Sequence, residues 1–176
     1  MTSKVKYFGI GLSRTGTTSL CSAFRTLGFK CVHYPQPKQL QILDRYDFAN
    51  DTPIPVRFQS LDKKFPNSKF IYTIRDIDSW LDSCSEYFSS EKAKLIKPKF
   101  DFQSQYRMET YGVIDFDRDI FRMVYAEHDK KVREHFKNRP DDILIMDVSE
   151  GDGWEKLLPF ILKNDSNVTS FPSASI

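Results

Sequence analysis

Apolar residues follow two different patterns along this chain, and the first of them predicts strands. Three short runs are mostly apolar and include β-branched or aromatic residues, which is typical of buried strands. They occupy residues 4–12, 69–74 and 142–148. A weaker run at 29–34 predicts a further strand.

The second pattern is an apolar stripe with helical spacing. In residues 16–28, for example, Leu20, Ala23, Phe24 and Leu27 recur at i, i+3, i+4 and i+7 before Gly28. Helices are predicted on these grounds at 16–28, 37–46, 55–65, 76–88, 115–138 and 154–164.

Two segments lack either pattern. Residues 47–55 contain two prolines and are predicted to form a loop, and residues 89–112 have no clear period and are predicted to form a lobe or lid. Strands that alternate with helices favour an α/β fold with three layers, in which a central parallel sheet is flanked by helices.

Length and composition limit the classes of protein. A chain of 176 residues with 40% hydrophobic content suits a single domain over 1–176. With 26 basic and 24 acidic residues, the charge is too balanced for a dedicated nucleic-acid binder, so an anion site must be local. Three cysteines without metal-type spacing indicate neither a disulfide framework nor a zinc site, which fits the reducing cytoplasm, and no apolar stretch suits a membrane span.

A glycine-rich loop follows the first predicted strand. Gly11 and Gly16 have the spacing of the nucleotide-triphosphate loop G-x-x-x-x-G-K-[ST], but Thr17 stands in the place of the lysine and the nearest cation is Arg14. Such a loop directs backbone N–H groups and a helix N-terminus at one anion. Tight packing alone could also explain the glycines, but the neighbouring hydroxyls and the arginine favour an anion site.

The sequence RTGTT at residues 14–18 resembles the 5′-phosphosulfate loop of sulfotransferases that use 3′-phosphoadenosine 5′-phosphosulfate (PAPS). Arginine stands where many cytosolic members carry lysine, as it also does in several carbohydrate and tyrosylprotein members. A second signature of that family is an arginine after a later strand and a serine eight residues further on, and Arg75 and Ser83 match it. Further blocks that resemble the smaller sulfotransferase-like family cover well over half of the chain.

This resemblance implies a P-loop-type fold and metal-independent transfer of a sulfuryl group from PAPS to a hydroxyl or amine. The acceptor would be a small molecule or a glycan- or lipid-like compound. With the hydroxyls of the loop included, the expected cofactor-binding residues are Ser13, Arg14, Thr15, Gly16, Thr17, Thr18, Arg75 and Ser83.

Catalysis would need a cation at the leaving group and a base at the acceptor. Arg14 is the expected cation. Asp51 is the first candidate for the base, because the family usually has an acidic residue before a proline here, and His33 is the second because its unperturbed pKa suits the task. His128 lies on an apolar stripe and is interpreted as a core histidine.

Two other classes of protein remain open. The run that ends at Asp147 resembles the magnesium-holding strand of a nucleotide kinase or ATPase, although that function leaves Thr17 unexplained and gives Arg75 and Ser83 no joint task. A nucleotide-binding module without catalysis would share the same cofactor motifs. The lysines of residues 91–100 are interpreted as a solvated face, with a role in holding an acidic acceptor or the cofactor as the alternative.

Overall fold

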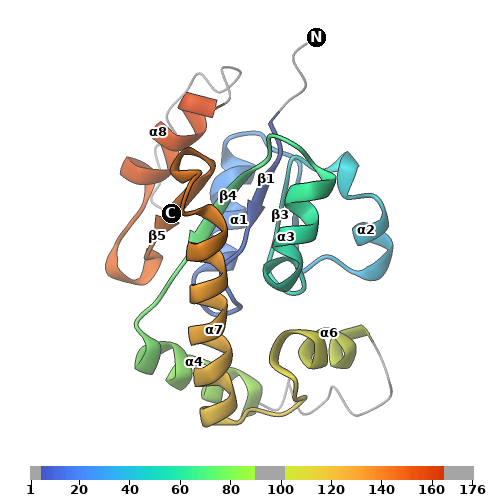
Figure 1. Ribbon diagram of the computed structural model, residues 1–176, viewed down its shortest axis with the longest axis vertical. Coiled ribbons are helices and arrows are strands. Elements are labelled where there is room, and N and C mark those ends of the chain that lie inside the picture. Colours follow the sequence, from blue (N-terminus) through green and yellow to red (C-terminus); the bar gives the residue numbers. More distant parts are fainter. Residues whose placement is uncertain (1–4, 90–101, 165–176) are drawn as a thin grey trace.

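The computed structural model describes residues 5–89 and 102–164, and five parallel strands form its central sheet (Figure 1). The strands lie in the order β2-β3-β1-β4-β5, and each neighbouring pair runs parallel. Their bounds are β1 (Tyr7–Gly9), β2 (Cys31–His33), β3 (Phe48–Asn50), β4 (Lys69–Thr73) and β5 (Ile143–Met146).

The helices that connect these strands largely match the predicted ones. They are α1 (Thr17–Thr26), α2 (Pro37–Gln41), α3 (Ile54–Lys64), α4 (Ile77–Ser89), α6 (Phe102–Tyr111), α7 (Arg118–Phe136) and α8 (Trp154–Asn164), with short 3₁₀ turns η1 (Leu43–Arg45), η2 (Pro140–Asp142) and η3 (Val148–Glu150). The single helix predicted at 37–46 is instead α2 followed by η1. Among the described residues, no helix combines the length and the apolar character needed to cross a bilayer.

Apolar side chains cover both faces of the sheet, which makes the fold three-layered. Tyr7 and Phe8 are neighbours on β1 and therefore point to opposite faces. Tyr7 belongs to a core shared with α1 and α8, where Phe24 of α1 stacks on Phe48 at 4.0 Å between ring centroids. Phe8 belongs to a second core shared with α3 and α7, which includes Phe136. The predicted α/β fold with a central parallel sheet flanked by helices is thus confirmed.

The loop predicted over residues 47–55 is wrong in part, because Phe48–Asn50 form β3 between β1 and β2. All three residues are buried. The apolar run of β3 is too short to be recognised as a strand in the sequence, because it lies between an aspartate and a proline-rich turn. The strand forms because two neighbouring strands pair with it.

Residues 89–112 are also more regular than predicted where the structure describes them. Residue 89 ends α4, and 102–111 form α6, while 90–101 lie outside the described residues together with the lysine run expected at 91–100. The buried residues of α6 are Ser104, Tyr106, Arg107, Thr110 and Tyr111. Because that buried face is largely polar, the segment has no apolar stripe from which a helix could be predicted.

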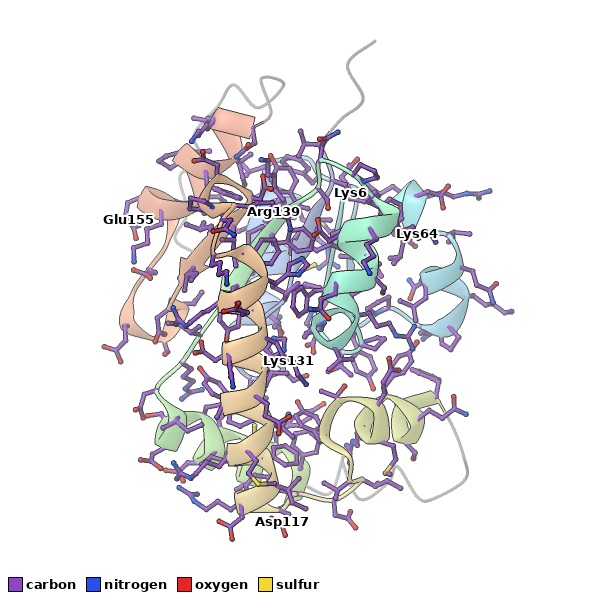
Figure 2. All side chains as sticks on the ribbon, in the orientation of Figure 1. Lys6, Lys64, Asp117, Lys131, Arg139 and Glu155 are labelled. Atoms are coloured by element: carbon purple, nitrogen blue, oxygen red, sulfur yellow. The ribbon has the colours of Figure 1, made fainter. Side chains whose placement is uncertain are left out.

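The long helix α7 packs against the sheet with one part and against α4 and α6 with the other. Asp117 caps its first turn by accepting hydrogen bonds from the N–H groups of Asp119 and Ile120, and Figure 2 shows Asp117 at one end of α7 and Arg139 beyond the other. His128 is buried on this helix, and its Nε2 lies 2.7 Å from the carbonyl oxygen of Ile10, to which it donates. Burial lowers the pKa of His128, and its burial and hydrogen bond confirm the interpretation of a core histidine.

The glycine loop passes so close to β4 that position 11 has no room for a side chain. A Cβ atom at Gly11 would lie 2.0 Å from Oγ1 and 2.4 Å from the carbonyl oxygen of Thr73. The backbone of the loop therefore rests directly on the end of β4.

We expect Gly11→Ala to lower the free energy of unfolding by about 1–3 kcal/mol or more, because the added methyl group must displace backbone. Gly153→Ala is the matched control, since its Cβ would meet the end of the Glu155 side chain at 3.2 Å and the carbonyl oxygen of Gly151 at an ordinary contact distance of 3.9 Å. Urea unfolding followed by circular dichroism measures both variants. Equal stability of the two would show that the close approach at Gly11 is absent.

Candidate active site

A pocket of about 530 Å³ lies at the edge of the sheet where the parallel strands end. In open α/β sheets this edge is the usual place of a ligand site. Its lining comes from the glycine loop, the turns after β2, β3 and β4, and the helices α4 and α6, which lie below this edge in Figure 1. The lining residues are Ser13, Arg14, Gly16, Thr17, Thr18, His33, Tyr34, Asp51, Thr52, Arg75, Tyr87, Phe88, Gln103, Arg107 and Tyr111.

The start of α1 supplies backbone donors to this pocket. Gly16 precedes the helix with φ 95°, a left-handed conformation that glycine adopts without strain, and a Cβ there would meet Val148 at 2.9 Å. No side chain caps the helix and its first turn has no acidic residue. Because the first N–H groups of a helix lack intrahelical partners, this end favours an anion beside Thr17 and Thr18.

Arg14 connects the two sequence motifs directly. Its Nε donates to Ser83 Oγ at 3.1 Å, and its carbonyl oxygen accepts from Arg75 Nη1 at 3.4 Å. The guanidinium of Arg14 also lies over the ring of Tyr87, 5.0 Å from its centroid. The residues predicted for the two ends of the cofactor therefore meet at one wall of the pocket.

Arg75 is held by its backbone while its guanidinium keeps spare donors. The hydroxyl of Tyr125 accepts from Arg75 N at 3.0 Å and donates to Arg75 O at 2.7 Å. The Nε atom of Arg75 is buried without a hydrogen-bond partner among the described residues. A buried donor without a partner is costly, and an anion bound beside this guanidinium would remove that cost.

The carboxylate of Asp51 joins the ends of three strands. Its Oδ1 accepts from Ser13 Oγ at 2.5 Å and from the backbone N–H of Thr52 at 2.6 Å, and its Oδ2 accepts from Thr17 Oγ1 at 2.9 Å. His33 Nε2 lies 3.3 Å from Oδ2. Asp51 is 7% exposed, so these contacts replace the water that a buried carboxylate would otherwise need.

Neighbouring hydrogen bonds fix the proton of His33. Asn50 Nδ2 donates to the carbonyl oxygen of Thr17 at 2.6 Å, which leaves Asn50 Oδ1 to face His33 Nδ1 at 3.1 Å. In a neutral ring, Nδ1 would therefore carry the hydrogen and Nε2 the lone pair. Nε2 also lies 3.4 Å from Thr18 Oγ1. An imidazolium formed by protonation of Nε2 would lie against the Asp51 carboxylate.

Thr15 and Ser83 are the two predicted residues that do not line the pocket. Thr15 Oγ1 donates to the carbonyl oxygen of Leu12 at 2.7 Å and lies 2.7 Å from Thr73 Oγ1, and Thr15 N also donates to Leu12 O. The side chain of Thr15 thus holds the shape of the loop, and Ser83 reaches the pocket through its contact with Arg14. The remaining predicted residues line the pocket together.

Several lining residues were missed by sequence reasoning. They are Tyr34, Thr52, Tyr87, Phe88, Gln103, Arg107 and Tyr111. Tyr34 and Thr52 each directly follow a predicted site residue in the sequence, so their position could have indicated that they line the pocket. Gln103, Arg107 and Tyr111 belong to α6, which had no recognisable period.

Tyr34 and Tyr111 line the pocket as neutral rings. Burial raises the pKa of Tyr34, the nearby Asp51 carboxylate raises it further, and Arg107 opposes this rise. Burial also raises the pKa of Tyr111. Burial raises the pKa of the Cys84 thiol to about 12, with Arg14 and Arg75 acting in the opposite sense, so this cysteine is no thiolate nucleophile.

Comparison with known families agrees with this geometry. A family model described as the sulfotransferase domain matches residues 6–41 and 36–175. The chain therefore belongs to the sulfotransferase family, which supports sulfuryl transfer as its general activity. A search of curated proteins finds no match.

Proposed function

We propose that this protein transfers a sulfuryl group from PAPS to the hydroxyl or amine of a small acceptor. One observation carries the proposal: a glycine loop without a lysine presents Arg14, and Arg14 contacts both Arg75 and Ser83. In the sulfotransferases that this sequence resembles, the corresponding residues bind the two ends of one nucleotide.

The donor end of the pocket fits a nucleotide with anionic groups at its 5′ and 3′ positions. The open N-terminus of α1 with Thr17 and Thr18 suits the 5′-phosphosulfate, and the spare donors of Arg75 suit the 3′-phosphate. When bound, PAPS supplies a sulfuryl group on a good leaving group. Arg14 would neutralise the charge that develops on that leaving group, with Ser83 holding the guanidinium in position.

The acceptor would lose its proton to a residue on the side of the glycine loop that faces β3 and β2. His33 Nε2 is the atom with an available lone pair, whereas the Asp51 carboxylate already accepts from Ser13, Thr17 and Thr52. We therefore propose His33 as the general base, with Asn50 orienting the ring through Nδ1 and Asp51 stabilising its protonated form. This reverses the order in which the sequence ranked the two candidates.

The kinase alternative has less support. No lysine lines the pocket among the described residues, so the outer phosphates of a nucleoside triphosphate lack their usual partner. Asp147 is absent from the described lining and instead accepts hydrogen bonds from Ser149 and Glu150 at the start of η3.

The compartment and the partners belong to the same proposal. The cysteines Cys21, Cys31 and Cys84 are free thiols, which suits a reducing cytoplasm. The pocket is sized for a small molecule. We therefore propose a cytoplasmic enzyme that acts on a small acceptor.

Thermal shift distinguishes the proposed donor from its rivals. Adenosine 3′,5′-bisphosphate without magnesium should raise the melting temperature by an amount that grows with the logarithm of its concentration. ATP with magnesium should raise it less at every concentration. The reverse order would support the kinase alternative, and stabilisation by the bisphosphate without transfer to any acceptor would support a binding module.

Replacement of Arg14 tests the assignment of the cation. Arg14→Ala should lower turnover on the order of 10²–10³-fold, because one preorganised charge opposite the leaving group is lost. Steady-state transfer of ³⁵S from labelled PAPS measures the rate, and bisphosphate titration measures donor binding. Arg57→Ala is the control, since Arg57 pairs with Glu109 at 2.6 Å and does not line the pocket. Near-normal turnover of Arg14→Ala with intact donor binding would refute the role.

The base is tested by a pair of conservative variants. His33→Gln should lower turnover by about 10²–10⁴-fold with donor affinity little changed, because the proton acceptor is removed. Asp51→Asn should lower it less, since Nε2 of His33 remains in place. A larger loss in Asp51→Asn than in His33→Gln, with both variants folded by circular dichroism, would return the role of base to Asp51.

A further inference from the structure

Arg107 is a buried cation in the pocket that has no acidic partner among the residues the structure describes. It is 7% exposed, its Nη1 donates to the carbonyl oxygen of Ile114 at 3.2 Å, and its guanidinium lies 4.6 Å from the ring centroid of Phe88. No ion pair involves it among the described residues. A buried charge without a counterion carries a large desolvation cost, which a bound anion would offset.

The side of the pocket proposed to bind PAPS, beside the glycine loop and the end of β4, already contains two arginines. Arg14 and Arg75 follow β1 and β4, and the only carboxylate that lines the described pocket is that of Asp51. The hydrogen bonds of that carboxylate go to the loop after β1 and to Thr52, so none of them neutralises Arg107.

Arg107 reaches the pocket from the side of β2 and His33, where the acceptor is proposed to bind. Its helix α6 docks on the turn after β2, where Tyr106 Oη donates to the carbonyl oxygen of Pro35 at 3.0 Å and the ring of Tyr106 lies 5.9 Å from that of Tyr34. The turn after β2 begins next to His33, and in the strand order β2-β3-β1-β4-β5 it lies on the opposite side of β1 from Arg75. The charge of Arg107 is close enough to Tyr34 to affect its titration.

We propose that Arg107 binds an anionic group of the acceptor, so that the substrate is a small hydroxylated acid. This inference rests on the proposed function. The acceptor hydroxyl would lie at His33 Nε2, and its carboxylate or sulfate ester would meet the guanidinium that Ile114 and Phe88 hold in place. The neutral rings of Tyr34 and Tyr111 would line the space between. Arg107 is then the residue that selects acids over their neutral analogues.

Binding to the protein saturated with adenosine 3′,5′-bisphosphate tests this without requiring turnover. The probes for isothermal titration calorimetry are 4-hydroxybenzoate, its neutral analogue 4-hydroxybenzamide, and inorganic sulfate. The wild-type protein should bind the acid or sulfate about 10- to 100-fold more tightly than the amide, because the hydrogen bonds are charge-assisted. Arg107→Met should abolish this preference and change the affinity for the bisphosphate by less than about twofold.

Two further variants separate charge recognition from loss of structure. Arg57→Met removes an arginine that bonds α6 through Glu109 at 2.6 Å outside the pocket, and it should keep the preference for the anion. Arg107→Lys keeps the charge without the planar guanidinium, so it should keep part of the preference even if Arg107→Met does not fold.

The outcomes divide clearly. Preference for 4-hydroxybenzoate assigns a carboxylate site, and Arg107-dependent binding of sulfate alone assigns a sulfate-ester site. Equal binding of acid and amide, binding of neither anion, or an equal loss of bisphosphate affinity in Arg107→Met would overturn the proposal, the last by assigning Arg107 to the donor. Arg107-dependent anion binding without any transfer from PAPS would refute the proposed function and leave the anion site standing.

Discussion

The carboxylate of Asp51 is the interaction on which the arrangement of the pocket depends. It follows β3, accepts hydrogen bonds from Ser13 and Thr17 of the loop after β1, and lies 3.3 Å from His33 at the end of β2. Because a buried carboxylate must keep its hydrogen bonds, the loop cannot move away from β3 without a large cost in free energy. Asp51 has φ 66°, a left-handed conformation that aspartate tolerates better than most residues. The short strand β3 thereby sets the position of the whole glycine loop.

The order of the strands divides the pocket into two chemically different halves. β1 lies in the middle and ends in the glycine loop, with β3 and β2 on one side and β4 on the other. The side of β4 presents a guanidinium from Arg75, whereas the side of β3 and β2 presents a carboxylate and an imidazole. A group that develops negative charge and a group that gives up a proton therefore have separate partners. This separation follows from the topology, since each side chain lies at the end of a strand or within two residues after it.

Sequence reasoning identified residues of the pocket where they lie on one strand and the turn after it. The glycine loop and the spacing of Arg75 and Ser83 could be read because a buried apolar run fixes the strand end and covalent spacing fixes the rest. It failed at β3, whose three residues have no pattern of their own and depend on pairing with β1 and β2. It also failed at Arg107, because α6 buries polar groups and its inward face cannot be told from a solvated one.

The structure also bears on the roles expected for two residues that were predicted from the sequence, Thr15 and His33. Thr15 was expected at the pocket by its place in the motif, yet its hydroxyl faces Leu12 and Thr73. His33 was ranked below Asp51, but the Asp51 carboxylate already accepts three hydrogen bonds, and we therefore propose His33 as the base. Both points depend on the directions of side chains, which spacing in the sequence does not contain.

The arginine at position 14 suits a reaction in which the leaving group departs without a proton. A guanidinium stays charged at all physiological pH values and is a poor proton donor, so it can neutralise charge but cannot protonate. In the proposed reaction, the 5′-phosphate of the bisphosphate product would be stable as an anion and would need only neutralisation. The single proton of the proposed reaction then moves from the acceptor to His33. Arg14 has φ 76°, which costs about 1–2 kcal/mol for a residue with a side chain, and the contacts of its backbone with Arg75 and of its guanidinium with Ser83 and Tyr87 hold it there. A permanent charge in a strained but fixed position is what electrostatic stabilisation of a leaving group needs, because no reorganisation remains to be done when the bond breaks.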